Sequence, residues 1–172
     1  GSEMCIRDRE KIIASSIGKW KENDMRVILQ RVRHASVTID GQVHGAIQNG
    51  FLALVGITQS DDEGIVKKMA KKCAELRVFE DEQGKMNRGL SDIQGDILSI
   101  SQFTLYADCK KGRRPGFEKA AHPAQANPLY ELFNKELRSY GLQVPTGVFG
   151  ADMKVELLND GPVTIILDSA EL

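Results

Sequence analysis

The chain has 172 residues, of which 41% are hydrophobic and 27% are charged, a mixture typical of one compact globular domain. Lysine and arginine number 23 and acidic residues 24, so the formal net charge of -1 excludes strong bulk attraction of the whole molecule to nucleic acid or anionic lipid. A local basic patch is still compatible with this balance.

Residues 1–24 differ from the rest of the chain because they show no clear periodicity, whereas a strongly patterned segment opens at Met25. They also lack the apolar centre of a signal peptide. We expect the natural chain to start at Met25 and residues 1–24 to be a non-native or disordered extension. A genuine, frayed N-terminal segment is the alternative. Residues 25–172 are predicted to form a single domain.

The first half of this domain is predicted to be mostly β-structure. Strands are expected at 27–32, 35–39 and 43–48, with a hairpin turn before the third. The continuous apolar run at 51–57 predicts a central strand buried on both faces. A helix should follow over about 62–76, with Asp61 or Asp62 as its N-cap and with core-facing residues at helical spacing, namely Ile65, Met69, Cys73 and Leu76.

The second half of the domain is also predicted to combine strands with one helix. A long strand is predicted at 97–106, and a basic loop follows it. A second helix should begin with Asn127 as N-cap and Pro128 at the first helical position. The last strands are expected at 144–148, 154–158 and 163–167. About eight strands and two helices predict an α+β fold, a mostly antiparallel sheet or barrel with two helices packed outside.

The sequence lacks several common catalytic patterns. There is no G-x-S-x-G, P-loop, G-x-G-x-x-G or H-E-x-x-H motif. The three histidines, His34, His44 and His122, lie near predicted turns or loops without metal-ligand spacing, which favours surface roles. Three scattered cysteines without a C-x-x-C pair argue against a disulfide framework or a zinc site and favour a reduced, cytoplasmic setting. An enzyme of this sequence is expected to use no metal, cofactor or conventional triad.

Two segments carry unusual polar residues. Ser101 and Gln102 interrupt a strand that should be buried, which costs free energy unless both are hydrogen-bonded. A binding role and a strand that emerges at the sheet edge are both compatible with this pattern. The segment at 110–114 holds four cations in five residues and could grip phosphates. A solvated loop is the alternative.

Two further segments combine small residues with a turn. At 146–153, small residues flank Phe149, which is typical of backbone that approaches a ligand, although ordinary turn chemistry explains it equally well. At 159–164, a Gly-Pro pair follows an aspartate and predicts a turn.

The order and spacing of these segments resemble the D-aminoacyl-tRNA deacylase family across nearly all of 25–168. A sister animal family carries Pro-Gln-Ala-Thr where this chain has Ser-Gln-Phe-Thr, so the main family is favoured. The matching stretches are Leu29-Gln30-Arg31-Val32, Ala35-Ser36-Val37, Ser101 to Leu105, Arg114-Pro115-x-Phe117, Phe149-x-Ala151-Asp152-Met153 and Asn159-Asp160-Gly161-Pro162-Val163-Thr164.

The resemblance implies an activity and a partner. Members hydrolyse the ester that joins a D-amino acid, or glycine mischarged on tRNA-Ala, to the terminal adenosine of tRNA. The family is homodimeric, without a cofactor or membrane, and a cis Gly161-Pro162 peptide of one subunit enters the pocket of the other. There it rejects L-amino acids by collision, while Arg31 pins the Gly-Pro segment.

The resemblance also implies site residues. Preorganised donors near Ser101, Gln102 and Phe103 would hold the ester carbonyl oxygen, and the ribose 2′-hydroxyl would help to activate water. Thr104 is expected to position groups rather than attack. The remaining expected contacts are an adenosine pocket lined by Phe149, Ala151 and Met153, and tRNA phosphates bound by Lys110, Lys111, Arg113 and Arg114.

Two other functions are compatible with the same residues. One is a non-catalytic tRNA-binding or nucleic-acid-binding module on this fold. The other is an editing domain of the threonyl-tRNA synthetase type, which acts on L-Ser-tRNA.

Overall fold

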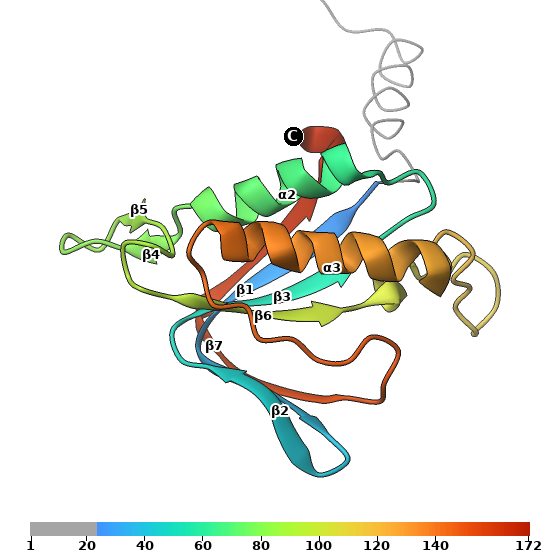
Figure 1. Cartoon of the computed structure of the whole chain (residues 1–172), viewed down its shortest axis with the longest axis horizontal. Coiled ribbons are helices and arrows are strands. Elements are labelled where there is room, and N and C mark those ends of the chain that lie inside the picture. The colour runs from blue at the N-terminus through green and yellow to red at the C-terminus, as the bar shows by residue number, and fades with distance from the viewer. Residues whose placement is uncertain (1–23) are drawn as a thin grey trace, which may run out of the picture.

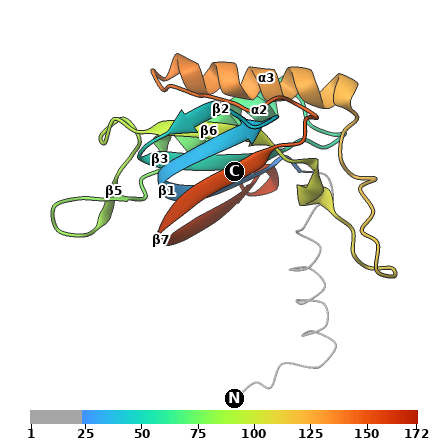
Figure 2. The same ribbon diagram turned by 90° about the horizontal axis from the view of Figure 1, so that it is seen from below.

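The structure is a computed structural model that describes residues 24–172 (Figure 1). The predicted extension at 1–24, apart from its last residue, lies outside the described residues. The described part consists of two α-helices packed on one face of a curved β-sheet, as the views in Figures 1 and 2 agree. This architecture confirms the predicted α+β class.

The elements follow one another in a mixed order along the chain. The strands are β1 (Arg26–Ile39), β2 (Gln42–Ile47), β3 (Gly50–Gly56), β4 (Phe79–Glu80), β5 (Met86–Arg88), β6 (Asp96–Ser101) and β7 (Lys154–Asp168). The helices are α2 (Glu63–Glu75), α3 (Pro123–Ser139) and the short 3-10 helices η1 (Phe103–Tyr106) and η2 (Ser169–Glu171). None of the helices among the described residues is both long and apolar enough to cross a membrane.

β1 organises the five-stranded sheet because it pairs along both of its edges. One edge runs antiparallel to β7 over most of the strand. The other edge pairs with β3 up to Val32 and with β2 from Ala35 onward, again antiparallel. β6 then lies parallel to β3. Because two strands share one edge of β1, the sheet curls, and the β1–β2 hairpin extends beyond the helices (Figure 1).

The main core lies between the helices and the sheet. Phe51 of β3, Met69 of α2 and Phe133 of α3 are all 0% exposed in this cluster. The next residue of β3, Leu52, points to a second cluster that also contains Leu98 of β6. The prediction that this strand is buried on both faces is confirmed. Each large apolar side chain buried in this way contributes about 1.5–3 kcal/mol.

The first predicted helix is present and is capped as expected. The Asp62 carboxylate accepts a hydrogen bond from the Ile65 main-chain N–H at 2.9 Å. Met69 and Cys73 are buried as predicted. Val66 and Ala70 are also buried, and Ile65 and Leu76 pack against the same core while partly buried, so the predicted core-facing side of the helix is confirmed and is wider than expected.

The second helix begins four residues before the predicted N-cap. Asn127 and Pro128 were expected at its start, but α3 begins at Pro123 after His122. The Ala126 N–H donates to the His122 carbonyl at 2.8 Å and closes the first turn. Pro123 therefore supplies the first-turn proline, and Pro128 lies inside the helix, where it removes one main-chain donor.

The long strand predicted at 97–106 is also different. β6 ends at Ser101, and the chain turns into η1 instead of continuing. The reason is a tertiary contact, since the Tyr106 hydroxyl donates to the Gly56 carbonyl at 2.9 Å and draws η1 against the end of β3. The predicted strand at 144–148 contributes one isolated bridge to β6, because Pro145 has no N–H to donate to a ladder.

The last two predicted strands, 154–158 and 163–167, belong to a single strand, β7. Its pairing with β1 shifts register on both sides of Val32, and the residues around Gly161 bulge out of the ladder. The predicted turn is therefore a bulge inside one strand, and it forms an exposed tip.

Candidate functional site

A cavity of about 560 Å³ opens at the carboxyl ends of the parallel strands β3 and β6. Val55 and Ile57 line it from the end of β3, and η1, the first turn of α3 and the segment before β7 complete its walls. Carboxyl ends of parallel strands meet at one edge of a sheet, so they bring the loops that follow them together. The fold therefore builds a pocket from segments that are distant in sequence.

Six of the predicted site residues meet in this cavity. They are Ser101, Gln102 and Phe103 at the end of β6, and Phe149, Ala151 and Met153 before β7. Thr104 is not among the lining residues, and its Oγ1 accepts a hydrogen bond from Gln102 Nε2. This bond ties the threonine hydroxyl to a side chain of the cavity wall.

The main-chain donors at the end of β6 are not equivalent. The Gln102 N–H donates to the Val55 carbonyl at 2.8 Å and is thus used by the sheet. The N–H groups of Phe103 and Thr104 stand at the start of η1, where a helix offers them no internal acceptor. Of these three groups, the last two are the ones that a ligand carbonyl could engage.

Aromatic side chains shape the wall of the cavity. The ring of Phe103 meets that of Phe117 edge to face, with 5.1 Å between centroids, and Phe149 lies 6.2 Å from Tyr130. The Tyr130 hydroxyl donates to the Ser99 carbonyl at 2.8 Å, which fixes this ring. Phe103 is 57% exposed and forms an apolar lip. Such a wall suits a flat, largely apolar group.

The segment 117–123 also lines the cavity, although none of the predicted site residues belongs to it. Glu118 and His122 line the cavity, although His122 was expected to have only a surface role. His122 is exposed, as predicted, and it precedes the first residue of α3. The available signal was Pro123, which marks a loop-to-helix junction of the kind that often carries binding residues.

Gly161 and Pro162 form the exposed tip of β7 and do not line the cavity of their own chain. The peptide bond between them is cis. Gly161 has a φ of +134°, and a Cβ at this position would lie 2.8 Å from Cγ2 of Val163. Only glycine fits this backbone without strain.

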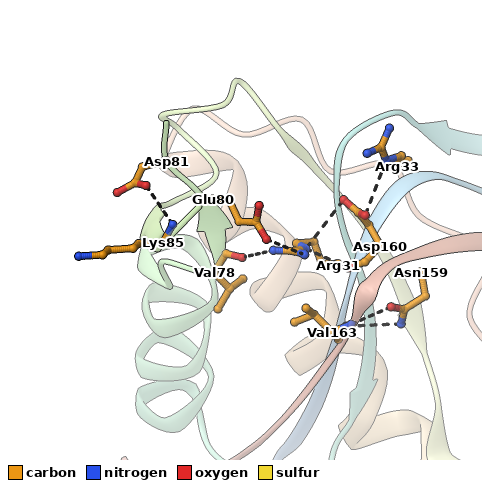
Figure 3. A network of polar contacts seen from close by, with 9 residues as sticks. All are labelled: Arg31, Arg33, Val78, Glu80, Asp81, Lys85, Asn159, Asp160 and Val163. Atoms are coloured by element: carbon orange, nitrogen blue, oxygen red, sulfur yellow. Dashed lines mark hydrogen bonds and ion pairs between the residues drawn. The ribbon is translucent and has the colours of Figure 1, made fainter. Parts of the chain in front are cut away.

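Arg31 of β1 is a buried charge behind this tip (Figure 3). Its Nε donates to the Asp160 carbonyl at 3.0 Å, and its Nη1 donates to the Val78 carbonyl at 2.7 Å. The carboxylates of Glu80 and Asp160 each lie 4.0 Å from a guanidinium nitrogen. These partners offset the cost of burying the guanidinium and fix the main chain of Asp160 relative to β1.

Asn159 closes the base of the tip from the other side (Figure 3). Its Oδ1 accepts a hydrogen bond from the Val163 N–H at 2.9 Å, and its Nδ2 lies 3.3 Å from Thr164 Oγ1. Arg33, which is largely exposed, adds a contact of 3.6 Å to the Asp160 carboxylate. The tip is therefore anchored at both of its ends.

The predicted phosphate-binding cations lie on an exposed loop at 109–115. The main chains of Asp108 and Gly116 close this loop with two hydrogen bonds of 2.7 and 2.8 Å. A second cavity, of about 320 Å³, is lined by three of the four cations, Lys110, Lys111 and Arg114, whereas Arg113 does not line it. Among residues 24–172, no three His, Cys, Asp or Glu side chains are placed to hold a metal ion.

Comparison with known proteins matches the part of the chain that contains the cavity and the tip. The family model for D-Tyr-tRNA(Tyr) deacylase matches residues 28–168. The chain belongs to this deacylase family. A relative from Brevibacillus brevis, named D-aminoacyl-tRNA deacylase, is 62% identical over 145 residues, which cover 84% of this chain and 100% of the relative. The predicted family is thus confirmed.

Two solved structures share the fold of this deacylase family member. One, named c-Myc DNA Unwinding Element Binding Protein, has a TM-score of 0.76 and 42% identity, covering 83% of this chain and 97% of its own. The other is described as a probable eukaryotic D-amino acid tRNA deacylase, with a TM-score of 0.73 and 16% identity, covering 84% of this chain and 99% of its own.

One buried carboxyl, that of Asp61, has an altered acidity. Burial raises the pKa of Asp61 from 3.8 to about 6, although the Thr58 N–H, which donates to Asp61 Oδ2 at 2.8 Å, acts in the opposite direction. The folded state therefore keeps this proton to a higher pH than the unfolded state. The stability due to this proton is present below about pH 4 and is lost as the pH rises to about 6.

An Asp61→Asn variant is expected to lack this loss of stability. Since one pKa unit corresponds to about 1.4 kcal/mol, the free energy of unfolding of the variant should gain up to about 3 kcal/mol on that of the natural sequence between pH 4 and pH 7. Urea unfolding at a series of pH values measures the difference. Parallel pH curves for the two proteins would contradict the assignment.

Proposed function

We propose that the protein hydrolyses the ester bond of D-aminoacyl-tRNA and releases the free tRNA and the D-amino acid. Glycine mischarged on tRNA-Ala is included as a substrate. The observation that carries the proposal is the meeting of Ser101–Phe103 with Phe149–Met153 in one cavity of a deacylase-family chain. The relative that is 62% identical and named D-aminoacyl-tRNA deacylase supports this activity.

The proposed chemistry relies on the main chain and on the substrate itself. An aminoacyl ester is already activated, so donors that meet the carbonyl oxygen as charge develops are sufficient. The N–H groups at Phe103 and Thr104 are the suitable donors, because the Gln102 N–H is engaged by Val55. The ribose 2′-hydroxyl beside the ester activates the attacking water, and Thr104 holds Gln102 in position. No cofactor takes part.

The proposed selection of D over L amino acids requires two subunits. Gly161 and Pro162 are exposed and lie outside their own cavity, which supports their insertion into the cavity of a second copy in a homodimer. There, fixed main-chain atoms would collide with an L side chain but not with a D side chain or glycine. Arg31 keeps the tip rigid through its bond to the Asp160 carbonyl.

The remaining proposed contacts bind the tRNA end. Phe149, Ala151 and Met153 line the part of the cavity proposed for the terminal adenosine. The basic loop formed by Lys110, Lys111, Arg113 and Arg114 is proposed to meet tRNA phosphates, with a cytoplasmic location that gives access to tRNA.

A second candidate is a nucleic-acid-binding module without catalysis. It is favoured by the 42% identical structure named c-Myc DNA Unwinding Element Binding Protein. A third candidate, an editing domain for L-Ser-tRNA, would use the same cavity.

Incubation of the protein with D-Tyr-tRNA, L-Tyr-tRNA and L-Ser-tRNA separates these candidates. We expect hydrolysis of the D-tyrosyl ester alone, because only an L side chain would collide with the main chain of the Gly161-Pro162 tip. Release of radiolabelled amino acid measures the result. Binding without hydrolysis of any ester would support the second candidate, and hydrolysis of the L-seryl ester the third.

A further inference from the structure

The second cavity, beside the basic loop, shares a wall with the candidate active site. Glu118 lines both cavities. The preceding residue, Phe117, lines the larger cavity and packs edge to face on Phe103 at its lip. The two cavities are thus adjacent, with Glu118 between them.

The shared wall is firmly attached to the sheet. The Glu118 carbonyl accepts a hydrogen bond from Gln59 Nε2 at 3.0 Å, and Ala120 forms an isolated bridge with Thr58. Both partners follow the end of β3, which also lines the larger cavity. The relative position of the two cavities is therefore fixed by contacts with the residues that follow β3, and not by the exposed loop alone.

The charges of the second cavity favour an anion. Two carboxylates, Asp108 and Glu118, also line it, and Asp108 Oδ1 is engaged by the Lys110 N–H at 3.0 Å. The cations outnumber them, and they are Lys110, Lys111, Arg114 and Lys119. Of these, Lys119 was not among the cations singled out from the sequence. Arg and Lys together are the side chains that bind phosphate oxygens most strongly.

We propose that this second cavity is a subsite for the phosphodiester that joins the terminal adenosine of tRNA to the nucleotide before it. The inference rests on the proposed function, which puts the terminal adenosine in the larger cavity. It differs from a contact with the acceptor stem, because a hollow next to the adenosine site reaches the single-stranded 3′ end and not the duplex. Arg113 lies outside this subsite.

The proposal predicts that the length of the substrate decides the effect of a mutation. The variant Lys111→Ala/Arg114→Ala/Lys119→Ala should be assayed with D-Tyr-tRNA, with a D-tyrosyl ester of the dinucleotide CpA, and with D-tyrosyl-adenosine. We expect KM to rise about tenfold or more for the first two substrates, which carry the phosphodiester. The kcat/KM for D-tyrosyl-adenosine should change less than twofold.

Salt dependence gives a second readout. Each phosphate contact with a single strand contributes about 0.7 to the slope of log affinity against log salt, so the variant should lose about 0.7 of slope with tRNA. The matched control is Lys67→Ala/Lys71→Ala/Lys72→Ala, which removes the same charge from exposed positions of α2 outside both cavities. It should leave KM for CpA unchanged.

Three results would overturn the subsite. One is an equal loss on D-tyrosyl-adenosine, which would indicate damage to the larger cavity. Another is an effect on tRNA but not on the CpA ester, which would move the contact to the acceptor stem. The last is the same effect from the α2 control. If the natural sequence hydrolyses none of the three esters, the proposed function itself fails, and the subsite with it.

Discussion

An Arg31→Ala variant is expected to hydrolyse L-aminoacyl-tRNA and to lower the D-over-L ratio of kcat/KM by about 10- to 100-fold. The guanidinium donates to the Asp160 carbonyl of the tip at 3.0 Å and is itself fixed by a bond to the Val78 carbonyl at 2.7 Å. A hydrogen bond to a charged group contributes about 1.5–3 kcal/mol, and 1.4 kcal/mol corresponds to a tenfold change. Without this bond, the tip can yield to an L side chain.

The matched control for this experiment is Arg33→Ala. Arg33 lies two residues away on the same strand and contacts the same Asp160, but it is 68% exposed and meets only the carboxylate. Exposed ion pairs contribute about 0–1 kcal/mol, so the ratio should stay within about fivefold. Arg31→Lys keeps the charge but loses the fork of donors, and an intermediate ratio is expected. If folded Arg31→Ala keeps the natural D-over-L ratio, Arg31 does not position the tip.

A Gly50→Ala variant is expected to lose about 4 kcal/mol of stability or more, enough to unfold a marginal domain. Gly50 opens β3 with a φ of +151°, and it pairs with Asp96 of the parallel strand β6. A methyl group here would overlap the main-chain oxygen of Asp96, and neither strand can move without breaking the ladder. Backbone strain of about 1–3 kcal/mol adds to overpacking of a similar size.

Gly41→Ala provides the comparison for this prediction. Gly41 also has a positive φ, of +76°, but no atom lies within 4 Å of the added Cβ. It should cost only the backbone strain, about 1–2 kcal/mol. Urea unfolding followed by circular dichroism measures both variants. Equal losses for the two would mean that strain alone, and not the contact with β6, determines the cost at Gly50.

The features that depend on neighbouring residues could be predicted from the sequence. The apolar run of β3 indicates burial on both faces, and the aspartate before α2 indicates its N-cap, because both signals act within one element. The end of β6 could not be predicted this way. Ser101 ends the strand because Tyr106 bonds to Gly56, a contact across 50 residues that no local pattern encodes.

The candidate site likewise combines features that local sequence indicates with features that depend on tertiary contacts. The motif residues around Ser101 and Phe149 were identified as a resemblance, but their meeting in one cavity depends on the parallel pairing of β3 and β6. The positions of Glu118 and Lys119 in the wall of the second cavity depend on the tertiary structure, and the charge pattern of the loop does not predict them. Arg31 illustrates it further, because its partner Val78 lies 47 residues away.

The pairing of β1 along both of its edges bears on the proposed discrimination between D and L substrates. Arg31 stands between Gln30, which pairs with Thr164, and Val32, which pairs with Asn159, while its own partner on the opposite edge is Phe51. The tip proposed to tell mirror-image substrates apart is thus attached to β1, which pairs with three other strands. We therefore expect the D-over-L ratio of the natural sequence to hold on heating for as long as β1 stays paired, whereas loss of the Arg31 side chain should lower it in the folded protein.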